Sequence, residues 1–311
     1  MNIQQFQYVL AVVDSKNFEL AAEKCFVTQS TLSTMIGKFE DEIGIKIFNR
    51  KTKPVSVTSE GNAIITRLRI VLNEIDQLGN LVQELKGEMV GELRIGIIAT
   101  VAPYILPRFL PNFVQQFPKV KTIVKEMTTD QIHEELKNRS LDVGILAIPL
   151  GDNELEEHKL YTEPFLLYDC RDDFETDLVS ANDLDYSKLW LLQEGHCLRT
   201  QIYQICNRSN SSSGTDLNFE FESGSMDSLL RFTKANKGKT IIPYLASLDL
   251  PPESKQRLVA FKEPVPVRSI GLLTNKFFVK KQLMTALQKS ILDSVSDLLP
   301  STGTIQIVDP V

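Results

Sequence analysis

The sequence has no apolar run of the roughly 18 to 20 residues that a helix needs to cross a bilayer. No basic stretch precedes its first short apolar run, Tyr8 to Val13, so the amino terminus does not have the pattern of a secretory signal. We therefore expect a cytoplasmic protein without membrane insertion. Cysteine is also scarce, with four residues in 311: Cys25, Cys170, Cys197 and Cys206. Because thiols are kept reduced in the cytoplasm, we expect no permanent disulfide framework, and any disulfide would act as a switch.

Signatures of several enzyme and metal-binding classes are missing. Neither the phosphate-loop pattern G-x-x-x-x-G-K-[ST] nor the dinucleotide pattern G-x-G-x-x-G occurs. Eight residues separate Cys197 from Cys206, which does not fit the short C-x2-4-C spacing of structural zinc sites, and His133 and His158 stand apart from both. We expect no metal, no cofactor and no enzymatic turnover.

The charge balance is acidic, with 34 Lys and Arg against 40 Asp and Glu, for a net charge of −6. An acidic chain is ordinarily a poor binder of polyanions. Residues 44–59, however, contain four cations and no acidic residue: Lys46, Arg50, Lys51 and Lys53. This segment is either a phosphate-contacting patch or an ordinary solvated loop.

The first 58 residues read as short amphipathic helices. Phe6, Val9 and Val13 have helical spacing, and Asn17 precedes a second helix. After a short break, Thr28 is placed to cap a third helix over residues 29–43. Residues 45–48 and 55–57 then read as two strands joined by the basic loop, which together form a small wing.

Thr58 can cap a helix of roughly thirty residues. Its apolar positions repeat nearly as a heptad: Ile65, Leu68, Leu72, Ile75, Leu78, Val82 and Leu85. A single long helix has no domain core of its own to cover such a stripe, so we expect it to pair with a second chain.

From residue 92 onward strands alternate with helices, which predicts an α/β architecture with a parallel sheet and helices on both of its faces. The expected strands are 93–98, 121–127, 141–148, 164–170, 188–193, 218–223, 240–244 and 268–274, and the expected helices begin after Pro103 and cover 225–235 and 280–299, with another from Asp130. This length accommodates two lobes, and ligands in such folds bind at the carboxyl ends of strands.

Two stretches are specific to a family. Ala21 to Ser33 and Phe39 to Arg50 resemble the winged helix-turn-helix of LysR-type transcriptional regulators, and the order of later elements extends the resemblance over the whole chain. The resemblance implies a winged helix-turn-helix DNA-binding domain (1–58), a dimerising linker helix (59–90) and a two-lobed periplasmic-binding-protein-like regulatory domain. Lobe I would comprise 91–162 and 268–311, and lobe II 163–267. It also implies a homodimer that assembles into a homotetramer, double-stranded promoter DNA as partner, and contact with RNA polymerase.

A recognition helix needs short polar side chains at its amino-terminal end. This chain offers Thr28, Gln29, Ser30, Thr31 and Ser33 there, and Gln29 is the strongest candidate to contact a base. Arg50, Lys51 and Lys53, together with Lys46, would contact phosphates and set the position of the protein on DNA rather than its sequence preference.

The run Gly195-His196-Cys197-Leu198-Arg199, with a second cysteine nine positions after the first, resembles the redox segment of peroxide-sensing LysR-type regulators. The resemblance implies that hydrogen peroxide oxidises Cys197, that Cys206 resolves it as a reversible disulfide, and that thioredoxin or glutaredoxin resets it. If 197–206 is helical, nine residues rise about 13.5 Å, whereas a disulfide needs Cα atoms roughly 4.4 to 6.8 Å apart. The helix would have to unravel, and the polar run 207–214 could absorb the change.

A thiolate at Cys197 would be stabilised by the helix start together with His196 and Arg199. By resemblance, Thr100, Thr129 and Arg268 would surround the reactive thiol. Each has another interpretation, because the threonines could cap the following helices and Arg268 could be a surface or lobe-closing cation. Thr200 departs from the acidic residue that peroxide sensors often carry at this position, which leaves the reaction rate open.

Three other interpretations remain. Cys197 and Cys206 could be buried packing residues, as we expect for Cys25 and Cys170. The chain could instead be a LysR-type regulator that answers to a small organic ligand in the interlobe cleft, with Thr100 and Thr129 binding a carboxylate at helix amino termini. A thiol peroxidase is the third possibility, which the helix-turn-helix argues against.

Overall fold

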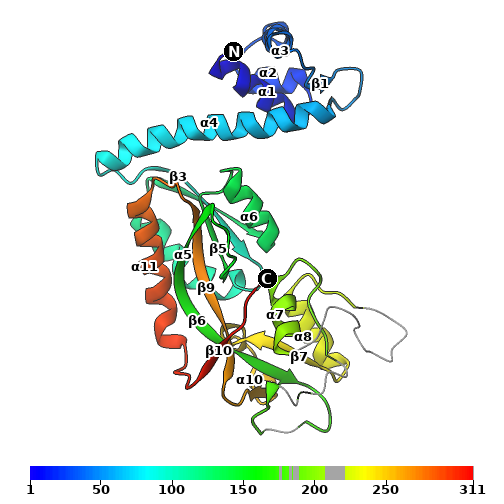
Figure 1. Cartoon of the computed structure of the whole chain (residues 1–311), viewed down its shortest axis with the longest axis vertical. Helices are drawn as coiled ribbons and strands as arrows, with labels where there is room; N and C mark the ends of the chain where they lie inside the picture. Colours follow the sequence, from blue (N-terminus) through cyan, green and yellow to red (C-terminus); the bar gives the residue numbers. More distant parts are fainter. Residues whose placement is uncertain (175–176, 182–183, 185–188, 207–220, 311) are drawn as a thin grey trace. The chain divides into compact units, whose positions relative to one another are not determined.

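The computed structural model describes residues 1–174, 177–181, 184, 189–206 and 221–310. The chain divides into two compact units (Figure 1). The first is formed by Met1–Gly87 and Asn138–Ser140, and the second by Glu88–Lys137 together with the chain from Leu141 onward.

The first unit contains three short helices and a hairpin, as predicted. They are α1 (Ile3–Ser15), α2 (Phe18–Lys24), α3 (Gln29–Ile43), β1 (Phe48–Asn49) and β2 (Ser56–Val57), with β1 and β2 antiparallel. The Asn17 side chain accepts hydrogen bonds from the first turn of α2, and Thr28 Oγ1 accepts one from the Thr31 backbone N–H at the start of α3. Leu32, Ile36 and Phe39 of α3 are fully buried against the other helices. The expected winged helix-turn-helix is confirmed.

The long helix α4 (Ser59–Leu85) begins at Thr58, whose Oγ1 accepts a hydrogen bond from the Gly61 N–H at 2.9 Å. The expectation that no domain core covers its apolar stripe is wrong for the first two positions of the stripe, because Ile65 and Leu68 are buried in the core of the first unit. Further along, Leu72 is half-buried, and the other four positions of the stripe, Ile75, Leu78, Val82 and Leu85, are each at least 38% exposed, as are the neighbouring Val71 and Leu81.

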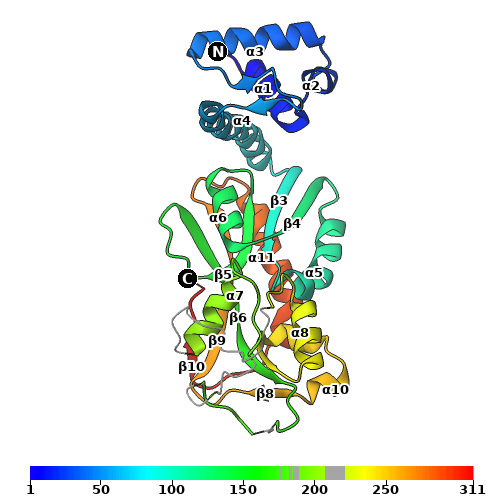
Figure 2. The same cartoon turned by 90° about the vertical axis from the view of Figure 1, so that its right-hand side faces the viewer.

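The second unit is built on a sheet with the strand order β4-β3-β5-β9-β6-β7 (Figure 2). Its strands are β3 (Gly91–Ile98), β4 (Val120–Met127), β5 (Val143–Ile148), β6 (Leu155–Asp169), β7 (Lys239–Pro243), β8 (Leu258–Ala260), β9 (Val265–Asn275) and β10 (Ile305–Ile307). The expectation of a parallel sheet holds for β3 with β4 and β5. It is wrong for the rest of the main path, because β9 and β6 run antiparallel to their neighbours there.

Eight helical segments complete the described part of this unit. They are α5 (Ala102–Gln116), α6 (Thr129–Lys137), α7 (Cys197–Ile205), α8 (Met226–Ala235), α9 (Tyr244–Leu248), α10 (Pro252–Lys255), α11 (Lys281–Val295) and the 3-10 turn η2 (Ser296–Leu298). Helices α5 and α11 lie together on one face of the sheet and α6 lies on the other (Figures 1 and 2). The expected strand at 188–193 appears in its described part only as isolated bridges at Leu189 and Leu192. Half of the expected strand at 218–223 lies outside the described residues, and its described half forms only the bridge from Ser223 to Leu192.

Two apolar cores form within the second unit. One gathers β3, β5, α5 and α11, and the other gathers α7, α8 and β7. Strand β6 runs through both, with Tyr161 in the first core and Phe165 in the second. Val308 also packs in the second core, although residues 268–311 were expected with lobe I. The remaining lobe boundaries stay predictions.

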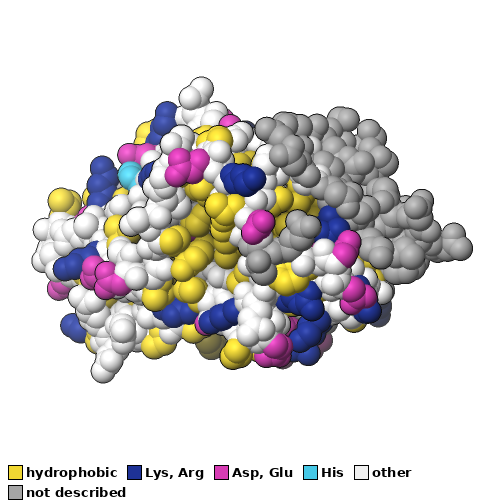
Figure 3. All heavy atoms as spheres, turned by 90° about the horizontal axis from the view of Figure 1, so that it is seen from below, with side chains coloured by type: hydrophobic (Ala, Val, Ile, Leu, Met, Phe, Trp, Pro, Cys, Tyr) yellow, Lys and Arg dark blue, Asp and Glu magenta, His cyan; other side chains and the backbone are white. Residues whose placement is uncertain are grey.

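The lower end of the second unit carries charges of both signs. In the space-filling view from below, apolar side chains gather in the middle of this face, with lysines, arginines and acidic residues around them (Figure 3). A face of mixed sign gives no continuous attraction for a polyanion. Within the described ranges, no helix is both long and apolar enough to cross a membrane.

Candidate functional site

The predicted sensor cysteine stands at the first position of α7. Gly195, with a φ of +89°, turns the chain ahead of the helix in a backbone conformation that residues other than glycine rarely adopt. His196 is the N-cap residue but makes no side-chain capping bond, and Cys197 follows with 6% of its surface exposed. Cys206 is the C-cap residue at the other end and is also buried. The segment between the two cysteines is therefore helical, as the argument about the disulfide requires. No disulfide joins the four cysteines, all of which lie among the described residues.

Thr129 lies beside the Cys197 thiol and does not cap a helix. The capping of α6 is done by its neighbour Thr128, whose Oγ1 accepts from the Gln131 N–H while Gln131 Oε1 accepts from the Thr128 N–H. The Thr129 hydroxyl is buried and has no hydrogen-bond partner of normal geometry among the described residues, yet it lies close enough to Cys197 to lower the pKa of the thiol. Thr129 is therefore available to the thiol and to any small polar ligand there.

Arg268 is buried, so its interpretation as a surface cation is wrong. Its guanidinium is 1% exposed, and it donates to Thr100 Oγ1 at 3.1 Å and to the Thr100 carbonyl at 3.0 Å. The capping interpretation of Thr100 fails as well, because α5 has Val101 as its N-cap residue, with no side-chain bond. The sheet thus brings Thr100, which follows β3, to Arg268 on β9.

A buried carboxylate completes this cluster. Glu163 on β6 is fully buried, and its Oε1 lies 2.8 Å from Arg268 Nη2 and accepts from Nε at 2.9 Å. Its Oε2 accepts from the Leu245 N–H at 2.8 Å. Sequence reasoning missed Glu163, since no motif in the strand marks it and only the cross-strand register of Glu163 opposite Arg268 brings the two together.

Burial dominates the electrostatics of the thiol. Desolvation raises the pKa of Cys197 above its ordinary value, while the Thr129 hydroxyl, the Arg268 charge and the backbone N–H groups at the helix start act to lower it. The structure does not show the expected stabilisation of a Cys197 thiolate by His196 and Arg199. Desolvation lowers the pKa of His196, which favours its neutral form, and Arg199 donates to the Leu192 carbonyl at 2.8 Å.

The other two cysteines lie elsewhere. Cys25 is half-buried beside the first unit's core, and Cys170 is buried at the end of β6. Burial raises the pKa of both thiols, as expected of packing residues.

The amino-terminal end of α3 presents the polar side chains expected of a recognition helix. Thr28, Gln29, Ser30 and Thr31 are exposed and Ser33 is half-buried. Thr28 is partly used internally, since its Oγ1 lies 3.0 Å from Ser30 Oγ and 2.8 Å from Thr31 Oγ1. Gln29 keeps its position as the candidate base contact.

The four wing cations are not equivalent. Lys46 pairs with Asp41 at 2.7 Å, and Arg50 donates to Ser33 Oγ at 2.7 Å and to Glu40 at 3.3 Å. Lys51 and Lys53 are exposed and have no acidic partner among the described residues. Two of the four charges are therefore partly neutralised within the domain, and the other two are open to a phosphate.

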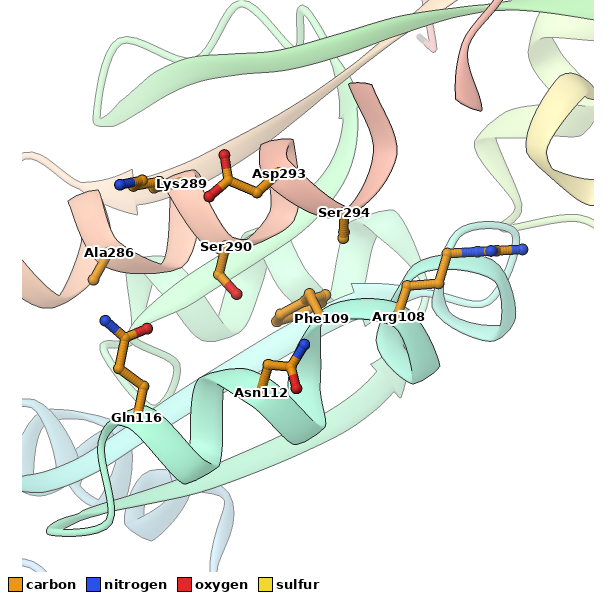
Figure 4. A pocket seen from close by; sticks show the side chains of 9 residues that line it. All are labelled: Arg108, Phe109, Asn112, Gln116, Ala286, Lys289, Ser290, Asp293 and Ser294. Carbon is orange, nitrogen blue, oxygen red and sulfur yellow. The ribbon is translucent and has the colours of Figure 1, made fainter. Parts of the chain in front are cut away.

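A hollow of about 380 Å³ lies away from the thiol, between α5 and α11 (Figure 4). Its lining is mixed, with Phe109 at the base and Asn112, Gln116, Lys289 and Asp293 around it. None of the residues predicted to act with Cys197 lines it.

Both parts of the chain match known families. Residues 3–62 match the bacterial regulatory helix-turn-helix protein family, lysR type, and residues 86–294 match the LysR substrate binding domain. The chain belongs to the LysR family of transcriptional regulators.

This LysR-type chain is 35% identical over 278 residues to the DNA-binding transcriptional dual regulator OxyR of Escherichia coli K12, covering 88% of this chain and 89% of that protein. It is 31% identical over 304 residues to the hydrogen peroxide-inducible genes activator of Haemophilus influenzae, covering 95% and 100%. A full-length OxyR from Pseudomonas aeruginosa has a similar structure, with a TM-score of 0.74, 27% identity, and coverage of 94% and 98%.

Proposed function

We propose that this LysR-type regulator senses hydrogen peroxide through Cys197 and Cys206 and controls oxidative-stress genes. One observation carries the proposal. The two cysteines stand at opposite ends of α7, and the first adjoins the buried set of Thr129, Arg268 and Thr100. The names of its relatives support the same signal.

In the first step, the Cys197 thiolate attacks one oxygen of hydrogen peroxide. The O–O bond breaks, the sulfur becomes a sulfenic acid, and hydroxide leaves and takes up a proton to form water. Thr129, which has no other partner of normal geometry among the described residues, can donate to a peroxide oxygen. Arg268 stabilises the negative charge on the thiolate and then on the leaving oxygen.

In the second step, Cys206 attacks the sulfenic sulfur, a disulfide forms, and a second water is released. Because α7 holds the two residues a full helix length apart, this step requires α7 to unravel. Residues 207–214, which were expected to absorb the change, lie outside the described residues. A cellular dithiol such as thioredoxin or glutaredoxin then reduces the bond.

The regulator would act on double-stranded promoter DNA as a homodimer and homotetramer and would contact RNA polymerase. The exposed apolar positions of α4 beyond Leu68 support pairing with a second copy. We also propose the cytoplasmic location that the sequence predicts, because a regulator of this kind must reach the chromosome. A regulator of this kind binds DNA and has no catalytic turnover.

The second candidate function is response to a small organic ligand in the interlobe cleft. It would need Thr100 and Thr129 to hold a carboxylate. Thr100 Oγ1 instead accepts from Arg268, and both threonines are buried, which favours a ligand as small as peroxide.

The test is peptide mass mapping without reductant after reduced protein receives about one equivalent of hydrogen peroxide. We expect a linked peptide pair containing Cys197 and Cys206 in wild type, none in Cys197→Ser or Cys206→Ser, and a shifted DNA footprint only in wild type. Unlinked thiols with an unchanged footprint would overturn the proposal and leave a ligand-responsive regulator.

A further inference from the structure

Glu163 and Arg268 form an ion pair with almost no exposure, next to the thiol site. A guanidinium in an apolar interior is costly unless a counter-charge and hydrogen bonds accompany it. Glu163 supplies the counter-charge through Oε1, and its other oxygen is fixed by the Leu245 N–H. The carboxylate is thus held from two sides.

The remaining donors of Arg268 are turned toward Thr100. Nη1 donates to its hydroxyl and Nη2 to its carbonyl, so the planar fork has one orientation. We infer that Glu163 is the positioning residue of the thiol site, which holds the Arg268 guanidinium against Thr100 and thereby keeps a positive charge near Cys197. This inference rests on the proposed function only for its effect on peroxide.

Glu163→Gln is a sharp perturbation because it keeps the shape of the side chain. An amide has one accepting oxygen where the carboxylate offers two, so its NH₂ must face either Arg268 or the Leu245 N–H. The guanidinium then loses its fixed position, and its effect on the thiol weakens. This loss outweighs removal of the carboxylate charge, because the side chains that act most on the pKa of Cys197 are Thr129 and Arg268 rather than Glu163. We expect the apparent pKa of Cys197 to rise by about one unit, which means roughly tenfold less thiolate at pH 7.

The measurement follows iodoacetamide alkylation of Cys197 against pH in the reduced full-length protein, quantified on the Cys197 peptide. Glu163→Gln and Arg268→Gln should both shift the pH profile upward, and the double variant should match Arg268→Gln alone, because Glu163 acts through Arg268. Glu156→Gln, the same change at an exposed position of β6, is the matched control.

A profile in Glu163→Gln that is unchanged or shifted downward would overturn the inference, as would a further shift when Glu163→Gln is added to Arg268→Gln. Alkylation needs no peroxide, so this result is separate from the proposed function. If the profile shifts as expected and peroxide forms no disulfide in wild type, the positioning role stands and the peroxide proposal fails.

A second, independent contact joins α7 to the end of the chain. Gln201 is fully buried on α7, and its Nε2 donates to the Val308 carbonyl at 2.8 Å. Val308 packs in the same core as Leu198 and Ile202, and its N–H donates to the Val267 carbonyl at 2.9 Å. Figures 1 and 2 both show the red end of the chain beside α7.

We propose that the hydrogen bond from Gln201 holds the carboxyl-terminal segment Ile305–Val308 against α7 as a latch, and that unravelling of α7 releases the segment. The other attachments of the segment are to β9, because the exposed residues of β10 pair with Val265–Val267 and the Val308 N–H donates to the Val267 carbonyl. Loss of α7 removes both the Gln201 hydrogen bond and the apolar surface under Val308. The release would make the carboxyl-terminal segment accessible in the oxidised state, which rests on the proposed thiol switch.

Hydrogen exchange of the peptide covering 300–310 tests the latch. In reduced protein, Gln201→Leu should speed exchange about three- to tenfold, because a buried hydrogen bond is lost, whereas Gln204→Leu on the exposed face of α7 should not. Equal protection in Gln201→Leu and wild type would overturn the latch without any use of peroxide.

The redox arm compares oxidised wild type with Cys206→Ser. Faster exchange of the 300–310 peptide only in wild type supports release. A confirmed disulfide with an unchanged tail overturns it, and absence of any disulfide contradicts the proposed function instead.

Discussion

Oxidation should remove α7 from the core, and the free energy needed to do so follows from the apolar side chains that α7 buries. Helix α7 spans 9 residues, so the Cα atoms of Cys197 and Cys206 are separated by about 13.5 Å along the axis. A disulfide needs at most about 6.8 Å. Leu198 and Ile202 are fully buried. Exposing both costs roughly 3 to 6 kcal/mol at the ordinary value for large apolar side chains.

That cost predicts how rarely the reduced helix opens. A free energy of roughly 3 to 6 kcal/mol corresponds to an open fraction of about one in 10² to one in 10⁴. Amides of α7 should therefore exchange about 10²- to 10⁴-fold more slowly than unstructured amides in reduced protein, and within about tenfold of them once the disulfide forms.

Hydrogen exchange read by mass spectrometry on peptides within 197–206 gives this number, with Cys206→Ser plus peroxide as control. Trp190 offers a second probe, because it is the only tryptophan in the sequence, lies in the same core as α7 and contacts Phe221 and Phe232. Its fluorescence should change with the same time course. Full disulfide formation with α7 protection intact would refute the reasoning.

Other predictions follow from particular side chains. Lys53→Ala should lower the slope of log affinity for promoter DNA against log salt by about 0.9, whereas Lys46→Ala, whose charge is already paired with Asp41, should change it less; equal slopes would contradict the contact. Thr129→Val should slow oxidation of Cys197 and raise the pKa of its thiol, while Thr128→Val should lower stability by about 1 kcal/mol through loss of the cap and leave the thiol alone. Alkylation of Cys197 in folded protein should be slow at pH 7 and should need a higher pH to accelerate than alkylation of the unfolded chain, because burial raises the pKa of the thiol and keeps the proton on sulfur; a rate that does not rise with pH would show that a thiolate is already present.

The local elements could be predicted closely because their signals are local. Thr28 and Thr58 each have a side-chain oxygen where a helix begins, and both cap the helices expected after them. Apolar periodicity likewise predicted α3 and α7, since a helix must bury one face whatever it packs against.

Contacts between distant segments were harder to predict. The sheet is mixed because β9 returns antiparallel beside β5, and the alternation of strands and helices carries no sign of strand direction. The sequence predicts that the neighbours of the thiol, His196 and Arg199, stabilise the thiolate, whereas the structure places Arg268 there, from a strand about seventy positions later.

The sequence by itself determined the helix-turn-helix, the long helix and the helical cysteine pair, because each depends on spacing within one short segment. Only the tertiary structure decided what surrounds Cys197. Burial sets the direction of its pKa, and strand pairing places Glu163 opposite Arg268. The Gln201 contact with Val308 spans 107 positions and depends, likewise, on how the segments pack. Desolvation and pairing of buried charges are properties of the assembled interior, which no local pattern encodes.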